Sequence, residues 1–301
     1  METAKAASRT FHRRQLPSVF SLGGLSVATI SRRVWSSLIQ DEIIDRSAEL
    51  AYLFLFAMFP ALILLSGMFS LFASASARAN IELMLYLAKV IPSSAFASVQ
   101  AAFSQSTRGS NTGHILFGAI TAVWLATFGM SSAQGILNVI YRTKEDRPYW
   151  RAKAIALFSI IAIFVLVCSA MLLLVVGDNL AKIFSNGLMF NPVMLLLWKI
   201  GKFVGSPFFM LLVFSITYRW GPAGKRHWRW ISPGAIVGIL GWLALSIAFR
   251  IYIHFLNPYT STYGSFAAAI VLLTWFYGSG FMLLLGAEIN SVIEQAANNH
   301  S

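Results

Sequence analysis

Charged residues are scarce in this chain. Only 11% of its 301 residues are Asp, Glu, Lys or Arg, whereas a soluble domain carries about 25%. Hydrophobic residues make up 57% of the chain, and its mean hydropathy is +0.69. This balance excludes an ordinary soluble domain and predicts a helical membrane protein. The apolar runs are continuous and do not alternate with polar residues, which argues against a membrane β-barrel.

The chain also has few of the residues that build catalytic or metal sites. Cys168 is its single cysteine, which excludes an intrachain disulfide and a multi-thiolate metal site. The five histidines are scattered, without pairs at metal-ligand spacing. We expect the adjacent acidic pairs Asp41-Glu42 and Glu145-Asp146 to lie among solvated loop charges. Because there is no Walker-type loop either, we predict no enzyme, no catalytic residue, no cofactor and no metal site.

Long apolar runs are what the sequence does contain. A transmembrane helix needs about 20 apolar residues at about 1.5 Å rise each. We predict an all-α fold, a polytopic bundle of six transmembrane helices, with spans at about 48–72, 114–139, 154–176, 203–218, 231–254 and 266–288. The last two spans form a hairpin around a short polar link. Short amphipathic helices at 33–45 and within 73–112 are expected to lie at the membrane interface.

Lys and Arg are unevenly distributed between the predicted loops. They are abundant in residues 1–33, 141–153 and 219–229 and absent from the 254–265 link. Cytoplasmic loops of membrane proteins carry the excess of Lys and Arg, so both termini are predicted to be cytoplasmic. The same distribution explains the net charge of +12 without a nucleic-acid partner.

Three regions follow from this topology. Residues 1–33 are predicted to be a flexible basic cytoplasmic tail, and residues 34–292 the membrane domain. Residues 293–301 then form a second, short cytoplasmic tail.

Polar side chains inside or beside the spans are the candidate functional residues. Such groups are costly in hydrocarbon and often face a cavity. The candidates for cavity or substrate contacts are Glu49, Asn138, Glu288 and Asn290 near the cytoplasmic side, and Arg250, Asn257 and Tyr259 near the outer side.

Arg250 and Glu288 are expected to face the bundle interior at opposite ends of one cavity, too far apart for an ion pair. Structural roles remain as alternatives. Glu288 could lie among headgroups, Arg250 could snorkel to the interface, and Asn138 could bind a neighbouring helix.

Proline and glycine in the spans predict kinks and close helix contacts. Pro60 removes a backbone hydrogen bond near the middle of the first span and is expected to kink it. Glycines allow neighbouring helices to approach closely, with a hinge as the alternative in the last span. The glycines concerned are Gly234, Gly278, Gly280 and Gly286.

A series of short motifs runs in order from about residue 50 to residue 290. The motifs are Leu50-Ala51-Tyr52, Phe59-Pro60, Trp124, Gly129-Met130, Leu137-Asn138, Tyr141, Arg147, Trp150, Tyr218-Arg219, Pro222, Pro233-Gly234-Ala235, Tyr252, Tyr263-Gly264-Ser265, Trp275 and Leu285-Gly286-Ala287-Glu288-Ile289-Asn290. None is specific alone, but their joint order resembles the YihY/BrkB family of bacterial inner-membrane proteins, formerly labelled ribonuclease BN. The chain departs from that family in its longer tail before residue 33 and in Glu49, where a small residue is expected.

The resemblance implies six spans, cytoplasmic termini and a place in the bacterial inner membrane. It implies no settled activity, because members are discussed as virulence or serum-resistance factors and as transporters. The ribonuclease label is widely regarded as a misassignment.

Two hypotheses on function therefore stay open. One is a transporter or flippase-like protein for a lipid-like or small anionic solute. The other is a non-transporting membrane scaffold for envelope partners. A water-accessible buried cavity would favour the first hypothesis, and a dry bundle the second. Membrane lipids are expected partners in both, and the oligomeric state is left open.

The charge distribution predicts the sidedness of the last hairpin. A reporter fused after Ser301 should read cytoplasmic, and one inserted at Thr260 should read external, because the 254–265 link lacks Lys and Arg. Reporter enzymes that are active on one side of the membrane measure this directly. A cytoplasmic reading at Thr260 would contradict the arrangement of six spans.

Overall fold

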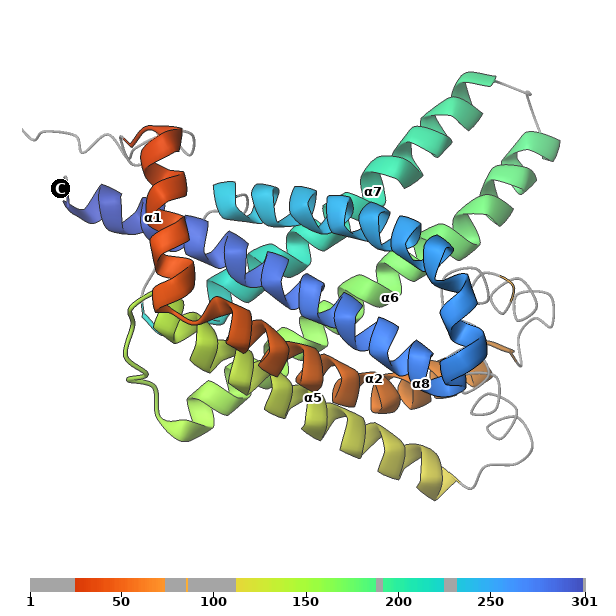
Figure 1. The fold of residues 1–301 in the computed structure, drawn as a ribbon. Coiled ribbons are helices and arrows are strands. Elements are labelled where there is room, and N and C mark those ends of the chain that lie inside the picture. Colours follow the sequence, from red (N-terminus) through yellow and green to blue (C-terminus); the bar gives the residue numbers. More distant parts are fainter. Residues whose placement is uncertain (1–24, 74–84, 86–111, 188–191, 225–231, 300–301) are drawn as a thin grey trace, which may run out of the picture.

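The computed structural model describes residues 25–73, 85, 112–187, 192–224 and 232–299. These residues form helices joined by turns, and there is no strand among them. Figure 1 shows long helices that run side by side, with the short helix α1 (Val27–Gln40) across one end of the bundle. Apart from Leu85, the amphipathic helices predicted within 73–112 lie outside the described residues.

Helix α1 is amphipathic and lies against the last helix, α8 (Pro233–Asn299). The Ser26 side chain caps its N-terminus by accepting a hydrogen bond from the Thr29 N–H at 3.2 Å. Ile30 and Val34 form its buried face and pack against Val292 of α8. Residues 27–33, which the sequence assigns to a flexible tail, are therefore helical, because the Ser26 cap starts the helix before the expected boundary.

Four further helices make up most of the bundle. They are α2 (Ile43–Ala73), α5 (Thr112–Ile140), α6 (Tyr149–Gly187) and α7 (Pro192–Trp220). Helix α2 continues through Pro60, whose side chain lies outside the described part of the chain.

Four segments of the described residues are long and apolar enough to cross a membrane. They are Ile120–Ile140, Tyr149–Ala170, Pro233–Tyr252 and Ala269–Asn298. Pro207–Trp220 of α7 is apolar but shorter. The described part of the chain is thus all-helical, and the protein is a multi-pass membrane protein. The bundle of six spans stays a prediction.

Helix α8 turns back on itself near its middle (Figure 1). If its 67 residues formed a straight helix, that helix would be about 100 Å long. Instead, the two legs contact each other in reverse order, since Gly234 lies against Gly286 and Leu245 lies against Gly278. The antiparallel hairpin predicted for the last third of the chain is confirmed.

Glycines allow these helices to approach one another at backbone distance. A Cβ added at Gly286 would collide with the Gly234 carbonyl oxygen and with the Tyr218 hydroxyl of α7. The same hydroxyl donates a hydrogen bond to the Leu283 carbonyl at 2.6 Å. A Cβ at Gly280 would press against α2, at 3.3 Å from Leu50 Cβ. Both legs of α8, α7 and α2 therefore meet with little room for side chains.

The buried core lies where α2, α5, α7 and α8 meet. Its members include Leu50, Leu137, Ile140, Phe214 and Leu284. Large apolar side chains elsewhere on the helices are exposed, among them Ile120, Phe158 and Ile247. In a membrane protein such outward apolar faces contact lipid.

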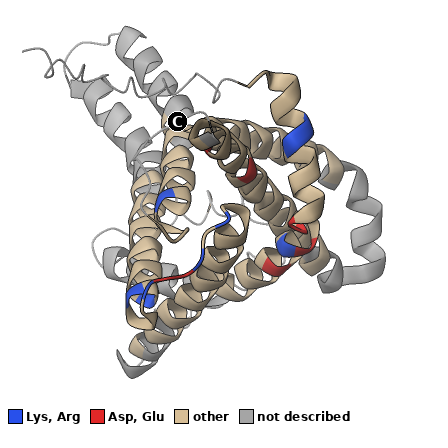
Figure 2. Cartoon of the chain, turned by 90° about the vertical axis from the view of Figure 1, so that its left-hand side faces the viewer, with Lys and Arg blue, Asp and Glu red and all other residues tan. Residues whose placement is uncertain are grey.

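One end of the bundle carries α1, the α5–α6 loop (141–148) and the C-terminal end of α8 (Figure 1), and we refer to it as the basic end. Figure 2 looks onto this end and shows charged residues gathered along the α5–α6 loop and around the turn between α1 and α2. The turn between the two legs of α8 lies at the opposite end.

Gly286→Ala should destabilise the protein, because the new methyl group has no room between the two legs of α8. Overpacking of this kind costs about 1–3 kcal/mol. Gly135→Ala on α5 is the matched control, since a Cβ there meets nothing within 4 Å; helix propensity makes this change neutral or stabilising by up to about 1 kcal/mol. Thermal unfolding in detergent measures both variants. Equal melting temperatures would contradict the close contact at Gly286.

Candidate functional site

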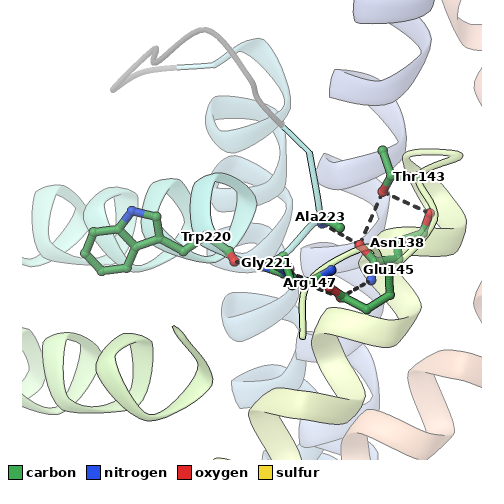
Figure 3. Close-up of polar contacts among 7 residues, drawn as sticks. All are labelled: Asn138, Thr143, Glu145, Arg147, Trp220, Gly221 and Ala223. Carbon is green, nitrogen blue, oxygen red and sulfur yellow. Dashed lines mark hydrogen bonds and ion pairs between the residues drawn. The ribbon is translucent and has the colours of Figure 1, made fainter. Parts of the chain in front are cut away.

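Asn138 lies near the C-terminal end of α5 and binds two neighbouring segments (Figure 3). Its Oδ1 accepts hydrogen bonds from the Ala223 N–H at 2.6 Å and from the Thr143 hydroxyl at 3.2 Å. Its Nδ2 donates to Glu145 Oε2 at 2.8 Å. The buried Asn138 amide thus ties the α5–α6 loop to the segment after α7.

Arg147 extends this contact to the last turn of α7. Its Nε and Nη2 each donate to the Glu145 carboxylate at 2.6 Å. Nη2 also donates to the Gly221 carbonyl at 3.2 Å, and Nη1 donates to the Trp220 carbonyl at 3.5 Å. Carbonyls at a helix end have no partner within the helix, and here the guanidinium supplies one. We refer to Asn138, Glu145 and Arg147 as the clasp.

The clasp responds to acid. Hydrogen bonds from the Arg147 guanidinium lower the pKa of Glu145 from 4.5 to about 2. A carboxyl group whose pKa is lowered on folding stabilises the fold above its unfolded pKa. The contribution of Glu145 is therefore complete above pH 4.5 and is lost as the pH falls towards 2.

Asp41, Arg142 and Glu288 meet at the basic end, and we refer to them as the acid junction. Arg142 Nη1 pairs with Asp41 Oδ1 at 2.8 Å. The Glu288 carboxyl lies against the Asp41 carboxyl and within electrostatic reach of Arg142. Asp41 is 3% exposed and Glu288 is 1% exposed, so both acids lie inside the protein. The expectation that Asp41 lies among solvated loop charges is wrong, whereas its neighbour Glu42 is exposed.

Two left-handed residues shape the acid junction. Glu42 has a φ of 53° and Arg142 a φ of 55°, values that residues other than glycine rarely adopt. The Arg142 N–H donates to the Val139 carbonyl at 3.0 Å, and the Thr143 N–H donates to the Asn138 carbonyl at 2.9 Å. This is the helix ending in which glycine usually occupies the left-handed place. Arginine at that place carries its guanidinium to Asp41.

Asn290 joins the two legs of α8. Its Oδ1 accepts a hydrogen bond from the Gly234 N–H at 2.8 Å, and its Nδ2 donates to Ser232 Oγ at 2.9 Å. The first N–H groups of a helix have no partner within it. Asn290 satisfies one of them across the hairpin, which gives this residue a structural contact.

The other predicted residues lie apart from the acid junction. Glu49 is exposed on α2, and its carboxylate accepts a hydrogen bond from the Ser132 hydroxyl of α5. Arg250 is exposed on the first leg of α8. It therefore does not face the bundle interior, contrary to the expectation from the sequence. Asn257 and Tyr259 belong to α8, but their side chains are outside the described part.

An open apolar groove lies between α6 and α7, with a volume of about 320 Å³. It is lined by Phe158, Ile161, Ala162, Val165, Leu166, Leu212 and Ile216. The Phe158 ring also packs on the Trp220 ring beside the clasp, with centroids 5.0 Å apart. The groove can hold a hydrocarbon chain, and none of the residues predicted from the sequence lines it.

Comparisons with known proteins agree on a family. The family described as virulence factor BrkB matches residues 34–301. YfkH of Bacillus subtilis, which is named a ribonuclease-like protein, is 33% identical over 251 residues, covering 83% of this chain and 90% of YfkH. A UPF0761 membrane protein of Alteromonas mediterranea is 24% identical over 295 residues, covering 97% of this chain and 94% of the relative. No solved structure matches the chain.

Asn138→Ala should destabilise the basic end, because the buried Ala223 N–H loses its acceptor. A buried donor left without a partner costs about 1–3 kcal/mol. Val139→Ala, at the next and more exposed position of α5, serves as the control. Unfolding in detergent should show a clear loss of stability for Asn138→Ala alone. Equal losses of stability in both variants would contradict the role of the clasp.

Proposed function

Because this chain belongs to the virulence factor BrkB family, we propose that it is a transporter or flippase-like protein for an anionic, lipid-like solute. The observation that supports this most directly is the apolar groove between α6 and α7, which lies beside the basic end. The groove suits the hydrocarbon part of an amphiphile, and cationic side chains close by suit its head.

The groove alone offers little selectivity. Its lining is apolar, but lipid tails are as apolar as the side chains that they would replace. Hydrophobic burial therefore hardly distinguishes the groove from the surrounding bilayer. Selectivity for one amphiphile has to come from its polar head.

Cations near the groove favour an anionic head. Arg151 is exposed on α6, two turns before Phe158 and thus about 10 Å along the helix. A guanidinium binds phosphate and carboxylate groups through two parallel hydrogen bonds. Lys153 lies between Arg151 and Phe158 in the sequence of α6, and its Nζ donates to Ser131 Oγ at 2.9 Å. An amphiphile whose chain fills the groove would place its head near Arg151.

The same proposal places the basic end on the cytoplasmic side of the membrane. The described residues of this end include Arg32 and Arg33 of α1 and Arg142, Lys144 and Arg147 of the α5–α6 loop, which favours the cytoplasmic side of the bacterial inner membrane. The groove and Arg151 would then take lipid from the inner leaflet.

We also infer that the ribonuclease-like name of YfkH does not describe this chain. Cleavage of RNA assisted by a metal needs a cluster of ligands. The five histidines of the sequence are scattered, without pairs at metal-ligand spacing.

Reconstituted vesicles test the proposal. The full chain should speed the movement of a fluorescent anionic phospholipid between leaflets, measured by chemical quenching of the outer leaflet. Ala162→Trp should slow this movement, because the indole would fill the groove. Val167→Trp is the matched control, since Val167 is exposed on the same helix outside the lining.

The headgroup is tested separately. Arg151→Gln should lower the preference for the anionic lipid over a zwitterionic one by roughly tenfold, because it removes charge-assisted hydrogen bonds. Lys144→Gln, an exposed change in the α5–α6 loop, should keep the preference. Movement no faster than in empty vesicles would contradict transport of this lipid and favour the scaffold.

A further inference from the structure

The acid junction holds more negative charge than its neighbours neutralise. Asp41 and Glu288 are 3% and 1% exposed, and Arg142 pairs with Asp41 Oδ1 at 2.8 Å. The Arg46 side chain binds the main chain instead, with its Nε donating to the Asp41 carbonyl oxygen at 2.8 Å. Among the described residues, two buried carboxylates thus face one guanidinium, which leaves one negative charge in excess.

Two carboxyl oxygens of the acid junction also have no donor. Asp41 Oδ2 and Glu288 Oε1 are buried and have no hydrogen-bond partner among the described residues. The two carboxyl groups face each other, so in the ionised state each of these two oxygens would meet only a second acceptor. A buried acceptor without a donor is costly, and two carboxylates in contact cannot both stay ionised cheaply. One proton would remove both costs.

We propose that the acid junction is a proton-binding site, in which one proton is held between Asp41 Oδ2 and Glu288 Oε1. The proton forms an O–H bond with one carboxyl group, and the other carboxyl group accepts the hydrogen bond. It comes from water at the basic end, which the site reaches through Arg142, whose side chain is 43% exposed. This site is distinct from the groove and does not depend on lipid movement.

The other titratable groups near the acid junction are not positioned to hold this proton. Glu42 and Asp45 beside the α1–α2 turn are exposed, as are Arg32 and Arg33 of α1. The nearby groups on the α5–α6 loop and on α7 are the buried Tyr141 and Tyr218. The Tyr218 hydroxyl already donates to the Leu283 carbonyl.

Release of the proton would leave an uncompensated charge between α1 and α8. Helix α1 is held on α8 by Ile30 and Val34, which pack on Val292. This small contact is the part of the fold that repulsion between Asp41 and Glu288 would loosen. The protein should therefore lose stability as the pH rises.

Thermal unfolding of the full chain in detergent, from mildly acidic to mildly alkaline pH, tests the site. The wild type should melt several degrees lower at the alkaline end. Glu288→Gln should melt like the wild type in acid and higher than the wild type in alkali, because its neutral amide imitates the protonated acid. Glu42→Gln, an exposed acid next to Asp41, should keep the wild-type pH profile.

Infrared difference spectra identify the proton itself. The wild type and Glu42→Gln should show the carbonyl band of a protonated carboxylic acid, which should be lost in Glu288→Gln and in Asp41→Asn. A Glu288→Gln variant that is less stable than the wild type at every pH, or that fails to fold, would overturn the proposal. So would stabilisation of the wild type by sodium chloride relative to choline chloride, because a sodium ion would then fill the site.

Discussion

Polar main-chain groups at the basic end are satisfied by side chains from other segments, and the arrangement of the helices there depends on this constraint. A helix end leaves carbonyl and N–H groups without partners inside the helix, and a lipid-facing surface supplies none. Arg147 binds the carbonyls after α7, Asn138 binds the Ala223 N–H, and Asn290 binds the Gly234 N–H. Each contact joins segments far apart in the sequence, so the polar groups fix how α5, α7 and α8 meet.

The acid junction departs from this pattern of complete pairing. Arg142 takes a left-handed place where glycine would cost less. Asp41 and Glu288 each bury an oxygen that has no donor within the described residues. Either feature alone could be tolerated in a stable bundle, but both costs fall on the same three residues. The ion pair with Asp41 offsets the cost at Arg142, and the proposed shared proton would remove the cost at the two oxygens.

The parts of this structure that the sequence predicted depend on local properties. Run length and composition predicted the helical membrane fold, and the polar link predicted the hairpin of α8. Asp41 was missed because its burial depends on the turn at Glu42, which carries α1 across α8; in the sequence it is one of two adjacent acids that resemble a solvated loop. Arg250 shows a different limit: helix rise predicts the depth of a residue, but packing decides which way its side chain points.

The groove and the acid junction share no residue, yet a continuous path of contacts joins them. Arg142 of the acid junction is followed by Thr143, whose hydroxyl binds Asn138. Asn138 binds Glu145, and Glu145 binds Arg147. Arg147 reaches the Trp220 carbonyl, and the Trp220 ring packs on Phe158 in the groove. Coupling between two sites needs an element with two arrangements that both sites influence. The α5–α6 loop holds Arg142 at the acid junction and places Arg147 against the Trp220 carbonyl, next to Phe158. Coupling through the clasp would therefore require two arrangements of this loop.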